Sequence, residues 1–314
     1  MLSYRHAFHA GNVPDVFKHG VLICCLEYLR KKEKPLLCID THGGAGYYNL
    51  TEGYAAKNRE WEQGITPLLK EPLGTLPPLA RSLVELVRKL NPRGRFLDSP
   101  PGHTGITRYP GSPAIMAALL REQDRGVCFE LHPADFTLLQ ARLRENPRIQ
   151  IRREDGLAAL KALVPPPSRR ALVFIDPSYE LKDDYRILPE ILKDALGRFS
   201  SGCYIIWYPL LGRKGRAGGE VGFPELLWSL YGGKRLRAEL YTRMGDSETR
   251  GLYGSGLIIY NPPWPLKDAL EGGLPFLGRL LGGKLNPGQG SAWDLRLEGE
   301  GPPGSRNHEP ENVS

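Results

Sequence analysis

The stretch at residues 36–46 reads LLCIDTHGGAG, an apolar run that ends in Asp40 and is followed by a glycine-rich turn. The apolar run predicts a short buried strand over 36–40. In doubly wound sheets, ligands bind at the carboxyl ends of strands, where glycines let the backbone approach the ligand. Gly44 and Gly46 therefore indicate a ligand-binding turn, although a tight structural turn would carry the same letters.

Strands and helices alternate around this turn. Before it, helical spacing of apolar residues predicts a helix over 14–34, which Pro35 stops. After it, apolar runs predict strands over 126–131, 148–152, 171–176, 202–207, 236–241 and 256–260. Helical stretches lie between most of them, at 113–122, 133–145, 156–163, 184–198 and 223–230. The alternation predicts an α/β, Rossmann-like fold with a mostly parallel seven-stranded sheet and helices on both faces.

Residues 47–104 interrupt the alternation. They hold a helical stretch around 55–90 and end in a Pro/Gly-rich piece at 99–105. We expect 47–104 to be an inserted helical subdomain in a core made of 1–46 and 105–297. The tail, 298–314, is polar and rich in Gly, Pro and Glu, so we expect it to be disordered.

The composition is that of a globular protein, with 314 residues, 41% of them hydrophobic. No apolar run approaches the ~20 residues that cross a bilayer, and the first residues lack the apolar stretch of a signal peptide. We therefore expect a cytoplasmic protein without membrane contact. The five cysteines lie inside apolar segments without metal-ligand spacing, which predicts reduced thiols in the core.

The formal net charge of +7 permits a polyanionic partner. Basic pairs are scattered along the chain, and each could be an ordinary solvated edge. Together they favour nucleic acid as the partner. The pairs are Arg152-Arg153, Arg169-Arg170, Arg213-Lys214 and Lys234-Arg235, the last with Arg237 nearby.

The cofactor alternatives differ in what the turn needs. A dinucleotide fingerprint that starts at Gly44 requires glycine at position 49, which is Asn49, and no helix start follows to receive a pyrophosphate. Sulfonium cofactors such as S-adenosylmethionine carry no phosphate and need neither feature. Glu130 ends the next strand, where a carboxylate would hold ribose hydroxyls. Asp155-Gly156 ends the third, where it could receive the adenine amino group of the cofactor. Either acid could instead cap a helix.

The strand at 171–176 ends in Asp176-Pro177-Ser178-Tyr179. An adenine amine is a weak nucleophile because its lone pair is delocalised into the ring. The Asp176 carboxylate and the Pro177 carbonyl could each accept a hydrogen bond from that amine and aim its lone pair, while Tyr179 would offer a face on which an extruded base stacks. This chemistry needs no metal.

A second string, Asn261-Pro262-Pro263-Trp264, fits the usual amino-methyltransferase pattern better by its letters. It follows the last predicted strand, whereas the reactive turn belongs after the strand that follows Asp155-Gly156. We therefore interpret it as a structural strand-to-turn segment.

Together with these residues, seven short strings give the chain its resemblance to one family. They read LSYRHAFHAGN at 2–12, DVFKH at 15–19, YPGSP at 109–113, ELHP at 130–133, SRR at 168–170, WYP at 207–209 and NPPW at 261–264. The chain resembles, over about residues 1–297, the bacterial adenine-N6 methyltransferases that act on large-subunit ribosomal RNA. The N-terminal string is the most specific, because generic methyltransferases lack it.

The resemblance implies a class I methyltransferase core with an N-terminal active-site segment, 1–34, and S-adenosylmethionine as cofactor. It implies large-subunit rRNA as partner, and we expect a monomer. The cofactor pocket it implies is lined by Lys18, His19, His42, Ser112, Glu130, Asp155, Gly156 and Asp176. Tyr4, His6, His9 and Lys18 are expected to close over the cofactor and the target base.

Three points remain open. His6, His9 and His19 could suggest a metal, but their spacing is not diagnostic and no acidic or Cys ligand adjoins them, so we expect none. Ser178 stands where the family usually has proline, which lowers the rigidity of the turn. The alternatives in function are an adenine-N6 methyltransferase that acts on DNA or another RNA, and a non-catalytic RNA-binding relative.

Overall fold

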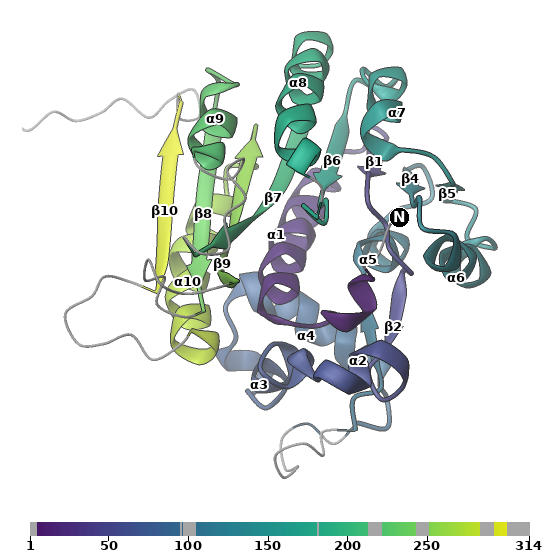
Figure 1. Ribbon diagram of the computed structural model, residues 1–314, viewed down its shortest axis with the longest axis vertical. Coiled ribbons are helices and arrows are strands. Elements are labelled where there is room, and N and C mark those ends of the chain that lie inside the picture. The colour runs from purple at the N-terminus through teal and green to yellow at the C-terminus, as the bar shows by residue number, and fades with distance from the viewer. Residues whose placement is uncertain are drawn as a thin grey trace, which may run out of the picture.

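A central sheet of eight strands organises the chain (Figure 1). The computed structural model describes residues 5–94, 96, 105–180, 182–212, 222–242, 251–282 and 292–299. The strands are β1 Leu37–Asp40, β4 Arg125–Phe129, β5 Ile149–Arg152, β6 Ala171–Ile175, β7 Cys203–Leu211, β8 Arg235–Tyr241, β9 Leu252–Tyr260 and β10 Trp293–Glu298. Their spatial order is β10-β8-β9-β7-β6-β1-β4-β5. The prediction of seven strands is wrong by one, because β10 adds an antiparallel edge to β8.

The direction of the strands defines where a ligand can bind. β5, β4, β1, β6 and β7 are parallel neighbours, whereas β9 runs antiparallel to both β7 and β8. The chain builds outward from β1 through β4 to β5 and then returns to β6 on the other side of β1. This reversal is a topological switch point, and the carboxyl ends of β1 and β6 flank it. The predicted Rossmann-like α/β fold is confirmed.

Helices cover both faces of the sheet. Successive residues of a strand point to opposite faces, so Cys38 and Leu172 belong to one apolar core, and Ile39 and Val173 belong to the other. The first core also receives α1 Val13–Leu29, α5 Ser112–Leu119, α6 Pro133–Leu143 and α10 Leu266–Leu281. The second receives α7 Gly156–Leu163, α8 Lys182–Arg198 and α9 Phe223–Ser229.

The first helix is shorter than its predicted range of 14–34. It ends at Leu29, with Arg30 as its C-cap. Beyond that point the backbone carbonyls accept hydrogen bonds from side chains: Arg121 donates to the carbonyl oxygens of Arg30 and Lys32. These contacts replace helical donors and turn the chain towards β1.

The described part of 47–104 forms several short elements instead of the single helical stretch predicted around 55–90. They are β2 Tyr47–Asn49, α2 Gly53–Asn58, the 3-10 turns η2 Glu60–Glu62 and η3 Leu73–Thr75, α3 Ile65–Leu69 and α4 Pro78–Leu90. β2 pairs with β3 Arg108–Pro110, and Gly64, Pro72 and Pro77 stand at the breaks between helices.

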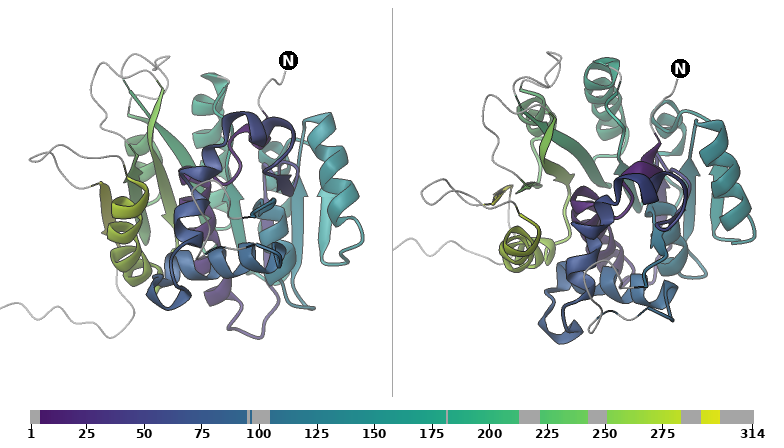
Figure 2. Two further views of the ribbon diagram at one scale, coloured as in Figure 1. Left: turned by 90° about the horizontal axis from the view of Figure 1, so that it is seen from below. Right: turned by 60° about the horizontal axis from the view of Figure 1, so that its bottom comes forward.

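The longest helix of this segment, α4, packs against α1 and α10, and Figure 2 shows these helices side by side. Gly20 of α1 lies so close to the Leu79 carbonyl that an added Cβ would overlap it. The helices of the segment therefore share the core of the sheet. The division into a core and an inserted subdomain stays a prediction, and most of the predicted 298–314 tail and 99–104 lie outside the described residues.

Candidate active site

The site begins at the amino end of α1. Asn12 caps the helix by accepting a hydrogen bond from the backbone N–H of Asp15, and Pro14 occupies the first turn. Asp15 and Lys18 lie one helical turn apart and so project from the same side of α1. Residues spaced in this way form a pair before any tertiary contact is made.

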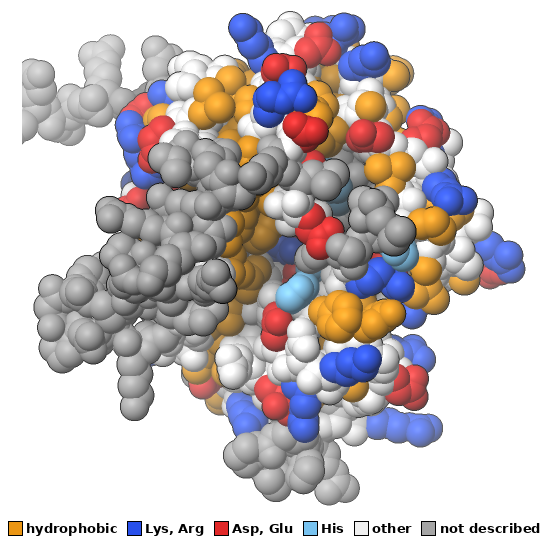
Figure 3. All heavy atoms as spheres, viewed as in Figure 1, with side chains coloured by type: hydrophobic (Ala, Val, Ile, Leu, Met, Phe, Trp, Pro, Cys, Tyr) orange, Lys and Arg blue, Asp and Glu red, His pale blue; other side chains and the backbone are white. Residues whose placement is uncertain are grey.

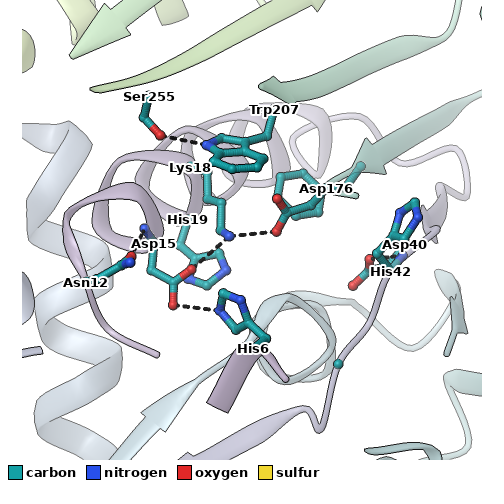
Figure 4. Close-up of polar contacts among 12 residues, drawn as sticks. His6, Asn12, Asp15, Lys18, His19, Asp40, His42, Asp176, Trp207 and Ser255 are labelled. Carbon is teal, nitrogen blue, oxygen red and sulfur yellow. Dashed lines mark hydrogen bonds and ion pairs between the residues drawn. The ribbon is translucent and has the colours of Figure 1, made fainter. Parts of the chain in front are cut away.

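Lys18 lies between two carboxylates from different parts of the chain (Figure 4). Its Nζ is 2.8 Å from Oδ1 of Asp15 and 2.7 Å from Oδ2 of Asp176, which follows β6. The side chains of Lys18 and Asp15 are 3% and 0% exposed, and that of Asp176 is 12% exposed. Low exposure strengthens the attraction within this triad and makes the loss of one member costly.

Asp15 also holds the segment before the helix. Its Oδ2 lies 3.0 Å from Nε2 of His6 and accepts a hydrogen bond of 2.9 Å from the Gly11 backbone N–H. Burial alone would raise the pKa of Asp15, but the charges of His6 and Lys18 and the His6 hydrogen bond hold it well below its ordinary value. Asp15 is therefore an ionised carboxylate that joins His6 to Lys18.

The N-terminal segment is also fixed by residues from 47–104. Nδ1 of His9 lies 2.9 Å from Oε2 of Glu60, and the Asn12 amide donates to the same oxygen. The Ile65 backbone N–H donates to the Gly11 carbonyl at 2.9 Å. Gly64 is packed against that carbonyl so closely that a Cβ would overlap it.

The carboxyl end of β1 contributes a second buried acid, Asp40, which sequence reasoning did not single out. Its Oδ1 accepts a hydrogen bond from the His42 backbone N–H, and its Oδ2 has no partner among the described residues. Burial raises the pKa of Asp40 to about 7, and the Ser112 side chain and the His42 N–H offset this only in part. Asp40 and Asp176 stand on opposite sides of the switch point between β1 and β6.

The glycine turn after β1 is tied to the end of β4. Oε2 of Glu130 accepts a hydrogen bond of 2.8 Å from the Gly44 N–H, and Oε1 accepts one of 2.6 Å from the His132 N–H. Burial raises the pKa of Glu130. Gly44 and Gly46 have φ angles of +58° and +74°, so a residue with a Cβ would be strained at either position.

The end of β5 takes the helix-cap geometry that the sequence left open. Oδ1 of Asp155 accepts from the backbone N–H groups of Leu157 and Ala158 at the start of α7. Gly156 lies against the Thr41 backbone after β1, where a Cβ would overlap the carbonyl. Asp155 thus caps α7, and Gly156 allows α7 to approach β1.

Two histidines of the site are held neutral by burial. Burial lowers the pKa of His19 to about 4, and Nδ1 of His19 lies 3.0 Å from the hydroxyl of Tyr109. Burial likewise lowers the pKa of His42 to about 4, and its Nδ1 lies 2.8 Å from Oγ1 of Thr41. Neutral imidazoles leave Lys18 as the main positive charge at the centre of the triad.

The turn after β6 differs from the expectation at Tyr179. The side chain is 9% exposed, and its ring packs against Tyr185 with a centroid distance of 4.8 Å and also contacts Phe223. Its hydroxyl donates to the Trp207 carbonyl at 2.6 Å. Because neighbouring rings already cover Tyr179, it fixes the turn in this arrangement and offers no open face for a base.

Trp207, which the sequence suggested only through the resemblance, lies beside the charged triad. Lys18 Nζ is 5.3 Å from the centroid of its ring, and the indole N–H donates to Oγ of Ser255 at 2.6 Å. That hydrogen bond fixes the ring from β9. No signal in the sequence linked Ser255 to this position.

The Asn-Pro-Pro-Trp string lies at the opposite edge of the sheet. Because β9 is antiparallel to β7, its last residue, Tyr260, pairs with Tyr204 near the start of β7. Asn261 has a φ of +50°, and its amide donates to the carbonyls of Ser200 and Gly202. Asn261 therefore closes a turn far from Asp176.

Figure 3 shows a hollow near the middle of the face seen in Figure 1, with a Lys or Arg side chain deep in it and His side chains at its rim.

Tyr4, expected to close over the site, lies outside the described residues. Within the described residues, no group of three or more His, Cys, Asp or Glu side chains could hold a metal ion. No helix in that part of the chain is long and apolar enough to span a membrane.

The family model and two relatives that match this chain are named as ribosomal RNA large subunit methyltransferases. The model of the family described as Ribosomal RNA large subunit methyltransferase D, RlmJ, matches residues 33–294. Ribosomal RNA large subunit methyltransferase J of Haemophilus influenzae is 39% identical over 281 residues, which are 90% of this chain and 94% of that protein. The Escherichia coli protein of the same name is 38% identical over 280 residues, 88% and 93% of the two chains. A crystal structure from Legionella pneumophila has a TM-score of 0.77 at 32% identity and covers 93% of this chain and 98% of that one.

Proposed function

The chain belongs to the family of Ribosomal RNA large subunit methyltransferase D, RlmJ, and we propose that it transfers a methyl group from S-adenosylmethionine to N6 of an adenine in large-subunit rRNA. The observation that carries the choice of the amine is the position of Asp176. It follows the switch-point strand β6, close to Asp40, and is paired with the buried Lys18. The non-catalytic alternative is disfavoured, because the relatives are named methyltransferases.

Asp176 and Pro177 orient the amine in this proposal. The Asp176 carboxylate and the Pro177 carbonyl each accept one N–H of the adenine amine, which turns the nitrogen lone pair towards the methyl group. The carboxylate also stabilises the positive charge that develops on the nitrogen as the new bond forms. The base has to leave its stack to reach this position, so an unpaired or weakly paired adenine is favoured.

The residues around the switch point fit a positively charged cofactor. S-adenosylmethionine, when bound, supplies a methyl group on a cationic sulfur. Asp40, Glu130, Asp155 and Asp176 place carboxylates at the ends of neighbouring strands or just beyond them, and Oδ2 of Asp40 is buried without a partner among the described residues. Glu130 would hold the ribose hydroxyls, and the turn at Gly44 and Gly46 would let the backbone approach them.

Lys18 keeps the site balanced. Its ammonium lies between Asp15 and Asp176 and compensates both carboxylates until the amine arrives. Asp15 retains the lysine when Asp176 turns to the amine, and it holds His6 beside the base-binding region. In this proposal His19, His42 and Ser112 also line the cofactor pocket. Tyr4 and His9 close over the cofactor and the target base.

The test is mass spectrometry of nucleosides from large-subunit rRNA of cells with and without the gene. We expect N6-methyladenosine to fall by one residue per rRNA in its absence, and purified protein with S-adenosylmethionine to restore it. Equal activity of the protein on duplex DNA and on deproteinised large-subunit rRNA would overturn the assignment of RNA as the substrate.

A further inference from the structure

The edge of the sheet opposite Asp176 carries a fixed, outward-facing basic loop. The chain leaves α1 at Leu29 and passes through 30–34 before β1 begins. Arg121 donates to the carbonyls of Arg30 and Lys32 at 2.6 and 2.7 Å, and Arg170 donates to those of Leu29 and Lys34. Two guanidinium groups thus hold the loop by its backbone.

The lysines of the loop point to solvent. Lys31, Lys32 and Lys34 are exposed, and none forms an ion pair with another residue in the part of the chain that the structure describes. Across 27–34, 121–125 and 168–170, eight cations face four acids. The cations are Arg30, Lys31, Lys32, Lys34, Arg121, Arg125, Arg169 and Arg170, and the acids are Glu27, Glu33, Glu122 and Asp124. This edge therefore holds a surplus of four positive charges, out of a formal net charge of +7 for the chain.

An exposed aromatic ring adjoins the lysines. Trp264 is 57% exposed and meets the Tyr28 ring edge-on at a centroid distance of 6.5 Å. Lys31 Nζ lies 5.8 Å from the centroid of that same Tyr28 ring. The turn that presents Trp264 is fixed by Asn261, which donates to two carbonyls and accepts from the hydroxyl of Tyr231.

This surface is separate from the candidate active site. Lys18 lies in the second turn of α1 and Arg30 is its C-cap, and a rise of 1.5 Å per residue places them about 18 Å apart along the helix. Trp264 follows the carboxyl end of β9, which lies beside the amino end of β7. A base bound at Asp176 could not touch Trp264 as well.

We propose that Lys31, Lys32, Lys34, Arg169 and Trp264, here called the basic edge, form a second RNA-binding surface that takes a single-stranded segment of the substrate rRNA. Lysines that follow a phosphate backbone, next to an aromatic face, are the combination that binds single strands without reading sequence. This rests on the proposed function for the identity of the RNA. The charge surplus favours a polyanion over a protein partner, and the exposed ring gives an unpaired base a place to stack.

The test uses the full chain and a fluorescein-labelled oligouridine of about 10 nucleotides, within the site sizes usual for single-strand binding. It contains no adenine, so binding is measured apart from methyl transfer. Trp264→Ala should weaken binding about 5- to 100-fold, and Trp264→Phe should retain most of the affinity because it keeps an aromatic face. Quenching of protein fluorescence by the RNA should decrease in both variants.

The charge contribution is tested by the double variant Lys31→Gln/Lys32→Gln. The slope of log affinity against log salt should decrease by roughly 1.4, because each lost phosphate contact on a single strand removes about 0.7. The matched control is Lys89→Gln/Arg93→Gln, which removes two exposed cations at the end of α4. The control should leave the slope nearly unchanged.

Several outcomes overturn the proposal. One is unchanged oligouridine affinity in Trp264→Ala and in the double lysine variant, with thermal unfolding showing that both are folded. Another is an equal loss in the control. A third is binding to phosphatidylserine vesicles that needs Lys31 and Lys32 while RNA binding does not. If oligouridine binding depends on the basic edge but large-subunit rRNA is never methylated, the proposed function fails and this surface stands.

Discussion

Lys18 Nζ lies 2.7 Å from Oδ2 of Asp176, although the two residues belong to α1 and to the turn after β6. The same ammonium lies 2.8 Å from Asp15, one helical turn earlier. A helix and a strand end that are far apart in sequence are thus joined by one buried cation. Lys18 holds Asp176, the side chain that would orient the amine. It can release Asp176 and still keep Asp15 as its own counter-ion.

Asp176→Ala should abolish methyl transfer and leave most of the fold intact, because the buried Lys18 keeps Asp15 as its counter-ion. Asp176→Asn should retain partial activity, since its amide oxygen still accepts a hydrogen bond but no longer carries the charge that favours a cationic amine. Single-turnover assays at saturating S-adenosylmethionine and rRNA separate the chemical step from binding.

Asn261→Ala is the matched control in the other Pro-containing turn. It should lower thermal stability, since two carbonyls and the Tyr231 hydroxyl lose their partner, and leave the chemical step nearly unchanged. If Asn261→Ala abolished the chemical step and Asp176→Ala did not, our proposal would have assigned the reaction to the wrong turn.

Asp15→Asn and Lys18→Met should each destabilise the protein, by up to about 3–5 kcal/mol. Asp15→Asn leaves the buried Lys18 with Asp176 as its one carboxylate, and Lys18→Met removes the ammonium that compensates both carboxylates. The double variant should lose less than the sum of the two, since it removes both charges of that pair. Urea unfolding of the four proteins measures the coupling. Additive losses would mean that the pair contributes nothing as a pair.

The pKa of Asp40 gives a pH dependence with a defined sign. The folded protein keeps the proton on Asp40 up to about pH 7, whereas the unfolded chain releases it near the ordinary value of 3.8. The contribution of Asp40 to the free energy of unfolding therefore falls between about pH 4 and 7, by at most about 1.4 kcal/mol per pH unit. His19 and His42, whose pKa values are lowered to about 4, have the opposite slope over much of this range. The measure is thus the difference between the wild type and Asp40→Asn in urea unfolding at several pH values, and parallel curves would contradict the prediction.

The same carboxyl should make cofactor binding depend on pH. A cationic sulfur favours ionised Asp40, so the affinity for S-adenosylmethionine relative to uncharged-sulfur S-adenosylhomocysteine should rise from pH 6 to 8. Asp40→Asn should flatten this ratio. Isothermal calorimetry with both ligands, in the presence of a chelator, gives the ratio directly, and a flat ratio in the wild type would exclude Asp40 from the cofactor site.

Glu130→Ala should weaken the binding of S-adenosylmethionine by about 1–3 kcal/mol, because the ribose contact is lost and the Gly44 N–H loses its acceptor. Asp155→Ala should mainly cost about 1 kcal/mol of stability, because its Oδ1 caps α7. Calorimetry and thermal unfolding of both variants separate the two roles. A larger loss of cofactor affinity in Asp155→Ala than in Glu130→Ala would contradict this assignment of the two roles.

Most of the sheet could be predicted because its central strands are short apolar runs between helical stretches. β10 was missed although 293–298 alternates apolar and polar residues, a period typical of an edge strand. α10 was missed because Gly272, Gly273 and Pro275 break its helical pattern. Gly273 is there for packing: a Cβ would lie 2.6 Å from Cδ2 of Leu79 on α4, a tertiary contact that no local pattern reveals.

The candidate site was predicted best where residues end strands. Asp176 and Glu130 could be placed because the sheet topology brings strand ends together. Asp15 could not be assigned to the site from the sequence. An acid in the first turn of a helix is common because it interacts favourably with the helix dipole, so its presence there indicates no function. The cover over Tyr179 by Tyr185 and Phe223 depends on how α8 and α9 pack, which the sequence leaves open.

The hydrogen bonds that join 5–12 to 60–65 bear on how this enzyme can be engineered. Glu60 holds His9 and Asn12, and the Ile65 N–H holds the Gly11 carbonyl. A chimaera that exchanges 47–104 for the segment of a relative would transplant only half of these contacts and leave His9, Gly11 and Asn12 without their partners. A functional chimaera therefore has to take 5–12 and 60–65 from the same parent protein, although 47 residues separate Asn12 from Glu60.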